Sequence, residues 1–532
     1  MDSQRSFAIR RIVAGVCCVL STAVWNVQTP ATESVIAVKA SKDWNVTADD
    51  MQRLGELAGG VGWEFEPRPE MDEGLRLIGI RRIRCINVAP FPGEFDEQGH
   101  FRVGDHPRLK AHFRSCRAVG ASPHMIIAPG AGQKDGRERL PPGVVTKNRI
   151  DWARFRNYCK ALFGYVLIES GFAQATFEVG NEPDIAEAIT GQGKGQRVNY
   201  EHYLDTYRQV AGAAREYEKE NPGRRVRLGG PALAWAFSFR YGDFNWTERF
   251  LQDVGREKIK LDFLGTHFYG NLSPLAGKRK SGFPSFSRMM QMTRQWRDKY
   301  TPGVPIHMTE WGASYHTSNE PASVINGNHV GAAFAAAFLN KMLETGVDRA
   351  IYLVTTDIRS QEDGKWVNVW GWPSLFVNPN VHGFHSKAPY NVFKMLAMMA
   401  PRRVEAVAPD NRIDCIVSRD DKKRLTALVW NYHRTVQESG PGIEAAGHAT
   451  VAIQVQDASK LWKAPVRYRR WLVSETVSNA YHLFSAGQPL DQRCELQQVD
   501  GGTAPIVNGM LSLKFQMPPS SVSLIEFEAA ED

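Results

Sequence analysis

The chain has 532 residues, of which 43% are hydrophobic and 23% charged, and its formal net charge is +8 at pH 7. This composition excludes a collagen-like or largely disordered chain and is typical of a globular protein long enough for more than one domain. The basic residues are scattered along the chain rather than gathered in a stripe, so the charge gives no reason to expect a nucleic-acid partner.

The first 31 residues predict a signal peptide. Arg10 and Arg11 precede an apolar stretch, residues 12–25, and small residues follow it as far as Ala31. A charged start, a short apolar stretch and small residues at a cleavage point are typical of secretory signals. The apolar stretch is shorter than the ~20 residues that cross a bilayer. We therefore expect residues 1–31 to be removed and the mature protein to be extracytoplasmic (secreted, periplasmic or at the cell surface), without stable membrane insertion.

Eight short runs rich in strand-forming residues alternate with amphipathic stretches that are typical of helices. In chain order these runs cover residues 60–66, 80–88, 123–130, 175–182, 225–233, 261–270, 305–312 and 349–357. This alternation predicts an α/β fold, a (β/α)₈ TIM barrel, over residues 32–400. An open doubly wound sheet is the structural alternative, but no GxGxxG motif follows an early strand. The first strand is the least defined, because residues 35–40 compete for it.

The pattern changes after about residue 400. Alternating apolar and polar runs separated by turn-rich spacers predict an appended β-sandwich over residues 401–532, without a convincing helix. Residues 32–45 could join this sandwich instead of the barrel, because such domains often take strands from both ends of a chain.

The cysteines do not suggest a metal site. Outside the predicted signal peptide they are Cys85, Cys116, Cys159, Cys415 and Cys494, which are widely separated and follow no zinc-ligand spacing. We expect most of them to be buried small hydrophobic residues, with one disulfide as the alternative. We expect no metal or organic cofactor.

The fourth and seventh predicted strands each end in a glutamate. Asn181 and Glu182 lie in "FEVGNEPD", and Glu310 lies in "HMTEWG". Because Pro183 follows Glu182, we expect extended backbone at Glu182. Functional groups of a TIM barrel gather at the carboxyl ends of its strands, so the two glutamates should meet across the barrel mouth. Two carboxyl groups at short separation are the machinery of retaining glycoside hydrolysis.

These motifs together resemble glycoside hydrolase family 39, the β-xylosidase and α-L-iduronidase family, within the clan of retaining (β/α)₈-barrel glycosidases. "FEVGNEPD" is close to the family's FEVWNEPN around its acid/base. "VRLGGPALAW", "DFLGTHFYG" and "PIHMTEWGAS" are similar to the family's fifth, sixth and seventh strands. The resemblance runs in order from about residue 60 to residue 432.

The resemblance implies a role for each matching residue. Glu182 corresponds to the acid/base and Glu310 to the nucleophile. Residues that the resemblance assigns to substrate binding are Asn181, His267, Tyr269, Arg84 and Trp311. Arg84 would orient the carboxylates below the sugar, and Tyr269 would lie near the nucleophile. Glu178 is expected to be a buried partner of Arg84 rather than a third catalytic group.

Some positions depart from the family pattern. Gly180 stands where the family usually carries tryptophan, which should widen the pocket. Lys278, Arg279 and Lys280 follow the sixth strand and could meet an anionic sugar, although a solvated loop is the simpler reading. Tryptophans that could stack on sugar rings follow the eighth strand at positions 366, 370 and 372.

The sequence therefore predicts an exported retaining glycoside hydrolase, β-xylosidase-like, that acts on an oligosaccharide or polysaccharide. One alternative is a catalytically inactive carbohydrate-binding protein on the same scaffold. Another is an endo-acting hydrolase of an anionic polysaccharide. The sequence names neither the sugar nor the oligomeric state.

Overall fold

The computed structural model of the protein describes most of the chain after the predicted signal peptide, which lies outside the described residues. The described residues are 33–43, 49–63, 67–86, 91–130, 140, 143–146, 149–184, 196–234, 245–270, 286–314, 321–356, 361–362, 365–366, 369–408, 413–432, 447–463 and 465–530.

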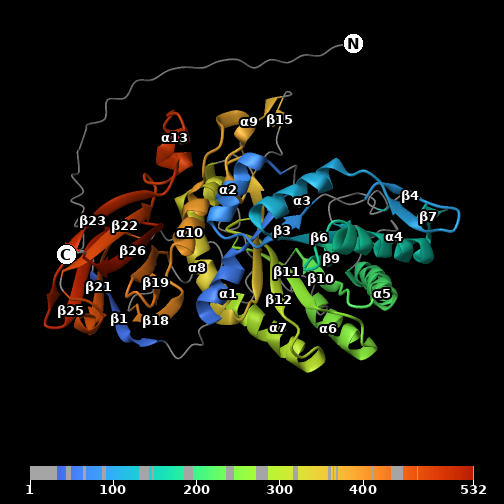
Figure 1. Ribbon diagram of the computed structural model, residues 1–532, viewed down its shortest axis with the longest axis horizontal. Helices are drawn as coiled ribbons and strands as arrows, with labels where there is room; N and C mark the ends of the chain where they lie inside the picture. The colour runs from blue at the N-terminus through green and yellow to red at the C-terminus, as the bar shows by residue number, and fades with distance from the viewer. Residues whose placement is uncertain are drawn as a thin grey trace, which may run out of the picture.

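Eight parallel strands close into a barrel, in the spatial order β10-β11-β12-β13-β2-β3-β6-β9 (Figure 1). They are β2 (Gly60–Trp63), β3 (Arg82–Cys85), β6 (Ser122–Gly130), β9 (Thr176–Asn181), β10 (Arg227–Leu233), β11 (Phe263–Tyr269), β12 (Ile306–Gly312) and β13 (Arg349–Tyr352). Each strand falls within one of the eight predicted runs or extends one residue beyond it, so the predicted TIM barrel is confirmed. The run at residues 60–66 supplies the first barrel strand.

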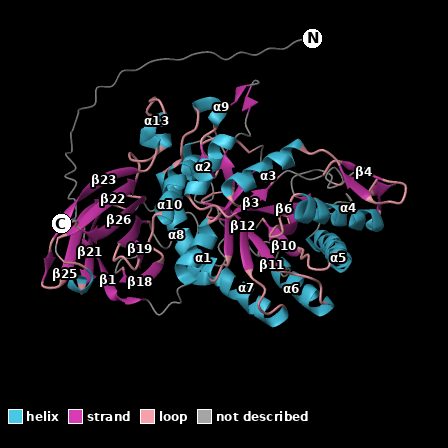
Figure 2. Cartoon of the chain, viewed as in Figure 1, coloured by secondary structure: helices cyan, strands magenta, loops and turns pink. Residues whose placement is uncertain are grey.

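Helices follow the barrel strands and cover the outside of the barrel (Figure 2). They are α2 (Pro69–Leu77), α3 (Pro107–Val119), α4 (Trp152–Gly164), α5 (Gln196–Glu220), α6 (Trp246–Glu257), α7 (Phe286–Tyr300), α8 (His329–Thr345) and α10 (Ala388–Ala397), with α1 (Asp49–Ala58) before the first strand. Side-chain caps explain several starts, because Asp151, Asn245 and Asn328 each accept a hydrogen bond from the first turn of the helix that follows. Among the described residues, no helix combines the length and hydrophobicity that a membrane span requires.

A ten-stranded sheet follows the barrel and includes one strand from the N-terminal side of the chain. Its order is β23-β22-β26-β20-β19-β18-β1-β21-β25-β24. The strands are β1 (Glu33–Asp43), β18 (Arg402–Val407), β19 (Ile413–Arg419), β20 (Leu425–Asn431), β21 (Ala449–Gln456), β22 (Val466–Val473), β23 (Gln497–Ala504), β24 (Ile506–Val507), β25 (Met510–Met517) and β26 (Ser521–Ala529). Residues 35–40 therefore lie in β1, which pairs with β18 and β21.

The two halves of this sheet face each other across a shared apolar core, as in a β-sandwich. Ile36 and Val451 from one half share that core with Val429 and Ile525 from the other. Two short helices, α12 (Ala458–Leu461) and α13 (Ala480–Ser485), interrupt the strands, so the expectation of no helix in this region is wrong.

The sheet packs against the barrel through α8 and α10. Leu428 and Leu524, on β20 and β26, belong to the same apolar cluster as the barrel core. Asn391 on α10 donates hydrogen bonds to the carbonyls of Ser478 and Cys494. These contacts bury the face of α8 that points away from the barrel, which is why nearly all of this small-residue helix is buried.

The remaining elements are short. They are β4 (Gly93–Phe95), β5 (Phe101–Val103), β7 (Val145–Thr146), β8 (Arg149–Ile150), β14 (Val354–Thr356), β15 (Gln361–Glu362), β16 (Lys365–Trp366), β17 (Ser374–Phe376), α9 (Pro379–His382), a π-helical turn at Tyr165–Glu169 and 3₁₀ turns at Pro321–Gly327 and Gln492–Cys494. The five cysteines outside the signal region are buried, as predicted, and free, so the alternative of one disulfide among them is not observed.

Candidate active site

Six of the seven predicted site residues converge at the carboxyl ends of the barrel strands. Arg84 lies on β3, Asn181 ends β9, Glu182 follows it, His267 and Tyr269 lie on β11, and Glu310 lies on β12. All six are linked by contacts shorter than 4 Å. The seventh residue, Trp311, lies elsewhere.

The end of β9 turns sharply so that two successive side chains enter the site. Gly180 has φ +80° and Glu182 has φ +52°, both in the left-handed region. The predicted extended backbone at Glu182 is therefore wrong: the Glu182 amide donates a 2.8 Å hydrogen bond to the carbonyl of Ala232 on β10, which holds the turn. Left-handed backbone suits glycine, so Gly180 has a backbone role that the sequence comparison alone did not suggest. Because this turn interrupts strand alternation, both Asn181 and Glu182 reach the site.

β12 carries an irregularity at Thr309, directly before Glu310. The register of β12 with β13 shifts between Met308 and Trp311, and its register with β11 shifts at His267. Such bulges re-aim side chains, and they are frequent next to active sites. Beyond the bulge the strand alternates regularly, so Glu310 points to the inside of the barrel mouth and Trp311 to the outside.

Trp311 is a core residue, which corrects its predicted role in substrate binding. Its side chain is fully buried and packs against Phe334 and Phe338 of α8, Tyr352 of β13 and Phe393 of α10, with ring centroids 4.9–6.5 Å apart. An indole enclosed by the helical layer cannot stack on a ligand in the barrel mouth.

Arg84 is the charged centre of the site. Its guanidinium is fully buried and donates hydrogen bonds of 2.8 Å to Glu310 and 2.6 Å to Asn181. It also pairs with Glu178, at 2.8 Å and 2.9 Å from two of its nitrogens. The prediction that Glu178 is the buried partner of Arg84 is confirmed. A buried guanidinium needs such partners, because burying it unpaired would be very costly.

Tyr269 and His267 complete the surroundings of the two glutamates. The Tyr269 hydroxyl donates a short hydrogen bond to the Glu310 oxygen that Arg84 does not contact. The Nδ1 atom of His267 lies 3.1 Å from Glu182 and 3.8 Å from Glu310, and its Nε2 atom lies 3.4 Å from Arg84. Burial lowers the pKa of His267 below its ordinary value, which favours the neutral ring.

The two glutamates experience different environments. Burial raises the pKa of Glu182 to about 7, and Arg84 only partly opposes this effect. Glu310, in contrast, accepts hydrogen bonds on both carboxylate oxygens, from Arg84 and from Tyr269. At neutral pH the site can therefore hold a protonated Glu182 beside a fixed Glu310 carboxylate, with carboxylate oxygens of the two within 4.8 Å of each other. Glu182 can then donate a proton to a substrate, and Glu310 can attack the same substrate as a nucleophile.

His124, which the sequence analysis did not single out, lies beneath the site. It is buried on β6, with Nε2 3.3 Å from Glu178 and Nδ1 2.8 Å from the Thr176 hydroxyl. A histidine within an otherwise apolar strand run was the available signal, but a single sequence does not show which face of the strand it occupies.

The group Glu182, His267 and Glu310 also has the composition of a possible metal site. One ligand atom from each lies within 4.8 Å of the others. However, the guanidinium of Arg84 contacts Glu310 and lies beside His267. Its positive charge would repel a metal ion bound between these residues. The donor set therefore fits a carboxylate pair better than a metal centre.

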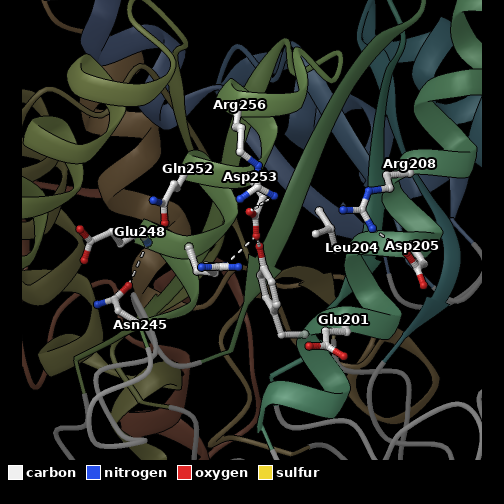
Figure 3. A pocket seen from close by; sticks show the side chains of 11 residues that line it. Glu201, Leu204, Asp205, Arg208, Asn245, Glu248, Gln252, Asp253 and Arg256 are labelled. Atoms are coloured by element: carbon white, nitrogen blue, oxygen red, sulfur yellow. Dashed lines mark hydrogen bonds and ion pairs between the residues drawn. The ribbon is translucent and has the colours of Figure 1, made fainter.

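Cavities among the described residues also lie outside the barrel mouth, and two of them border the barrel. One, of about 630 Å³, lies between α5 and α6 and is lined mainly by charged side chains, including Asp205, Arg208, Glu248 and Asp253 (Figure 3). The other lies at the opposite end of the barrel strands, where Arg227, His307 and Arg349 line it. Neither contains a predicted site residue.

The predictions for the loops around the site concern a basic segment, residues 278–280, and the tryptophans after the eighth strand. Lys278, Arg279 and Lys280 lie outside the described residues. Trp370 is buried and packs against Tyr481 and Phe484 of α13, with ring centroids 5.0–5.4 Å apart. This tryptophan therefore belongs to a small satellite core rather than to an open binding surface.

Comparison with known proteins identifies the family of this chain. The family model "Glycosyl hydrolases family 39" matches residues 168–458, more than half of the chain. The chain belongs to glycosyl hydrolase family 39. The matched segment contains Glu182 and Glu310 and the strands that carry them, so this family 39 protein is a glycoside hydrolase with a carbohydrate substrate.

Solved structures show the same fold at low sequence identity. A family 39 enzyme from Xanthomonas axonopodis pv. citri has a TM-score of 0.71 at 17% identity, over 95% of this chain and 100% of that one. A family 39 β-xylosidase from Caulobacter crescentus has a TM-score of 0.65 at 18% identity, over 93% and 99%. A bacterial orthologue of human α-L-iduronidase has a TM-score of 0.64 at 13% identity, over 94% and 84%. No curated protein sequence matches this family 39 chain significantly.

Proposed function

We propose that this protein is an exported retaining glycoside hydrolase that cleaves O-glycosidic bonds of an oligosaccharide or polysaccharide by double displacement. Glu182 is the acid/base and Glu310 the nucleophile. The observation that carries the proposal is the separation of at most 4.8 Å between their carboxylate oxygens. Retaining enzymes have carboxyl groups ~5–5.5 Å apart, whereas inverting enzymes leave ~6.5–9.5 Å for a water molecule.

In the first step, a Glu310 oxygen attacks the anomeric carbon while protonated Glu182 donates its proton to the leaving oxygen. This breaks the glycosidic bond and leaves the sugar covalently attached to Glu310. In the second step, Glu182 takes a proton from water, the water oxygen attacks the anomeric carbon, and the ester bond to Glu310 breaks. Both steps use carboxyl groups and water, so the proposed reaction requires no metal or organic cofactor.

The neighbouring side chains suit these roles. Arg84 and Tyr269 hold the two oxygens of Glu310 in fixed directions, which supports nucleophilic attack from a defined position. Burial keeps the pKa of Glu182 near 7, which suits a group that gives up a proton and later recovers it. We propose that Asn181, which lies beside Glu182 and accepts a hydrogen bond from Arg84, contacts the sugar's 2-hydroxyl group.

The substrate that we propose first is a β-xyloside. The similarity to the family 39 β-xylosidase supports this choice. The similarity to the α-L-iduronidase orthologue makes uronate-containing substrates the second set to assay. A panel of aryl glycosides and polysaccharides, assayed with wild type and Glu310→Gln side by side, tests the proposal. Hydrolysis by wild type alone supports it, and no hydrolysis of any substrate that binds would favour a carbohydrate-binding protein.

Export is proposed on the N-terminal sequence, where Arg10 and Arg11 precede the short apolar stretch. Expression of the full chain in a bacterial host, followed by N-terminal sequencing of the protein in the extracytoplasmic fraction, tests this. Cleavage near residue 23 or 31 is the expected result, and an intact N-terminus in the cytoplasm would contradict export.

A further inference from the structure

A third glutamate, Glu178, lies below the catalytic pair and is inaccessible to a substrate. Its side chain is fully buried on β9, one layer below Glu182. A charged side chain at such a depth is costly unless it is paired, so its presence needs an explanation beyond packing.

Arg84 joins Glu178 to the nucleophile. The Nη2 and Nε atoms of the guanidinium lie 2.8 Å and 2.9 Å from one Glu178 oxygen. Its Nη1 atom donates a 2.8 Å hydrogen bond to Glu310. The single positive charge of Arg84 is thus shared between two carboxylates. Without Glu178, the charge of Arg84 would be balanced by Glu310 alone, and the buried layer near Glu182 would lose one negative charge that opposes the ionisation of Glu182.

The fold reserves space for Glu178 from two sides. His124 lies 3.3 Å from one carboxylate oxygen. The other oxygen lies where β11 has Gly265, and a Cβ atom at position 265 would come within 2.7 Å of it. Any side chain larger than glycine at position 265 would therefore force the Glu178 carboxylate to move.

We propose that Glu178 is a positioning residue that acts through Arg84: it neutralises the guanidinium and so keeps the acid/base Glu182 protonated at the pH of the reaction. This inference rests on the proposed function. It assigns Glu178 no contact with the sugar and no proton transfer.

The electrostatics of the buried layer support this role. Burial alone would raise the pKa of Glu178, but Arg84 and His124 together lower it below its ordinary value, so Glu178 remains ionised. Arg84 is in turn the group that opposes the raised pKa of Glu182. The titratable groups that face Glu178 from the packed elements are Arg84 of β3, His124 of β6, His267 of β11, His307 and Glu310 of β12, and Tyr203 of α5. Among these, Arg84 alone carries a permanent positive charge.

The test compares two variants of Glu178 by their pH profiles of kcat/KM on an oligosaccharide that wild type hydrolyses, because its poor leaving group needs the proton of Glu182. Glu178→Gln keeps the shape of the side chain and removes its charge, so Arg84 should favour ionised Glu182. The alkaline limb should then move about one pH unit toward lower pH. Glu178→Asp keeps the charge but draws it back by one methylene group, so kcat should fall while the limb moves less than in Glu178→Gln. Glu178→Gln without a shift, or equal shifts in both variants, would overturn the inference.

Asp253→Asn serves as the matched control. Asp253 is a buried carboxylate that pairs with Arg249 and Arg256 on α6, away from the barrel interior. Its replacement should lower the thermal unfolding temperature and leave the alkaline limb unchanged, which separates a pH effect from a loss of stability.

If Glu178→Gln does not fold, Gly265→Ala takes its place. The added methyl group would come within 2.7 Å of Glu178 Oε1, so the carboxylate must shift and its contact with Arg84, made through Oε2, is disturbed without any change of charge. We expect the alkaline limb to move in the same direction, and a stable Gly265→Ala variant with an unshifted limb would overturn the inference. Wild-type hydrolysis that Glu310→Gln abolishes establishes the proposed function independently, so the two failures can be distinguished.

Discussion

Arg84 donates a 2.8 Å hydrogen bond to Glu310, and this ion pair makes Glu182 and Glu310 electrostatically unequal. Glu182 has no such direct bond to Arg84 among the described contacts; its neighbour is the neutral His267, 3.1 Å away. Glu182 can therefore hold its proton at neutral pH while Glu310, with an oxygen within 4.8 Å of it, is fixed by hydrogen bonds on both carboxylate oxygens. This asymmetry is the physical basis of the proposed mechanism.

Glu310→Gln should lower kcat by several orders of magnitude, because an amide cannot form the covalent intermediate. The substitution keeps the size of the side chain, so the thermal unfolding temperature should change by no more than a few degrees. Steady-state kinetics and thermal denaturation on the same preparation check both expectations. Activity within tenfold of wild type in a folded variant would exclude Glu310 as the nucleophile.

The raised pKa of Glu182 determines how we expect kcat/KM to depend on pH. Because burial raises the pKa of Glu182 to about 7, the proton donor is lost as the pH rises through 7, and kcat/KM should fall above that pH. Glu182→Gln should abolish this alkaline limb. It should slow substrates with poor leaving groups far more than activated aryl glycosides, because the latter need little protonation. Equal losses on both kinds of substrate would argue against an acid role.

The same carboxyl group should reduce stability at neutral pH. Its pKa is about 7 in the folded protein and 4.5 as the ordinary value, so folding favours the protonated form. That contribution is fully present below pH 4.5 and is lost as the pH rises through 7. Glu182→Gln should therefore be about 2–3 kcal/mol more stable than wild type at pH 8 and no more stable at pH 4. Denaturant unfolding at the two pH values measures the difference, and a gain of equal size at both would contradict the electrostatic origin.

Gly180→Ala should disturb catalysis through the backbone. At φ +80° any residue with a Cβ atom is strained by about 1–2 kcal/mol, and relief of that strain would turn Glu182 away from His267. We expect kcat to fall by at least tenfold with a small loss of stability. Gly171→Ala is a suitable control, because Gly171 also has positive φ and has open space around it, remote from the site. Equal kinetics in the two variants would show that the turn at Gly180 does not position Glu182.

Trp311→Phe distinguishes a core residue from a substrate contact. The indole is buried among aromatic rings of α8 and α10, so its truncation should lower the free energy of unfolding by about 2 kcal/mol. KM should remain within twofold, because the ring does not face the site. A large increase in KM at unchanged stability would restore the role that the sequence suggested.

The contrast between Glu310 and Trp311 shows what could be predicted from the sequence. Strand runs and family motifs located the eight strands, Glu182 and Glu310, because each is a local signal. Strand alternation alone turns Trp311 away from the side that Glu310 faces, and the motif resemblance obscured that signal; only the bulge at Thr309 could not be predicted. The prediction of extended backbone at Glu182 was wrong because its backbone hydrogen bond to Ala232 on the next strand overrides the preference imposed by Pro183.

The buried layer below the site was only partly predictable. Glu178 could be paired with Arg84 from the motifs, but the approach of His124 and the space left by Gly265 depend on three strands that are distant in sequence. Such side-chain arrangements emerge from barrel closure rather than from any one segment.

The account depends most on double displacement, and the anomeric configuration of the first-formed product tests it most directly. Proton NMR during hydrolysis of a substrate of known configuration records that product before it mutarotates. Because Glu182 and Glu310 approach within 4.8 Å, we predict the same configuration in product and substrate. A product of inverted configuration would require a water molecule between the two glutamates and would contradict the proposed mechanism.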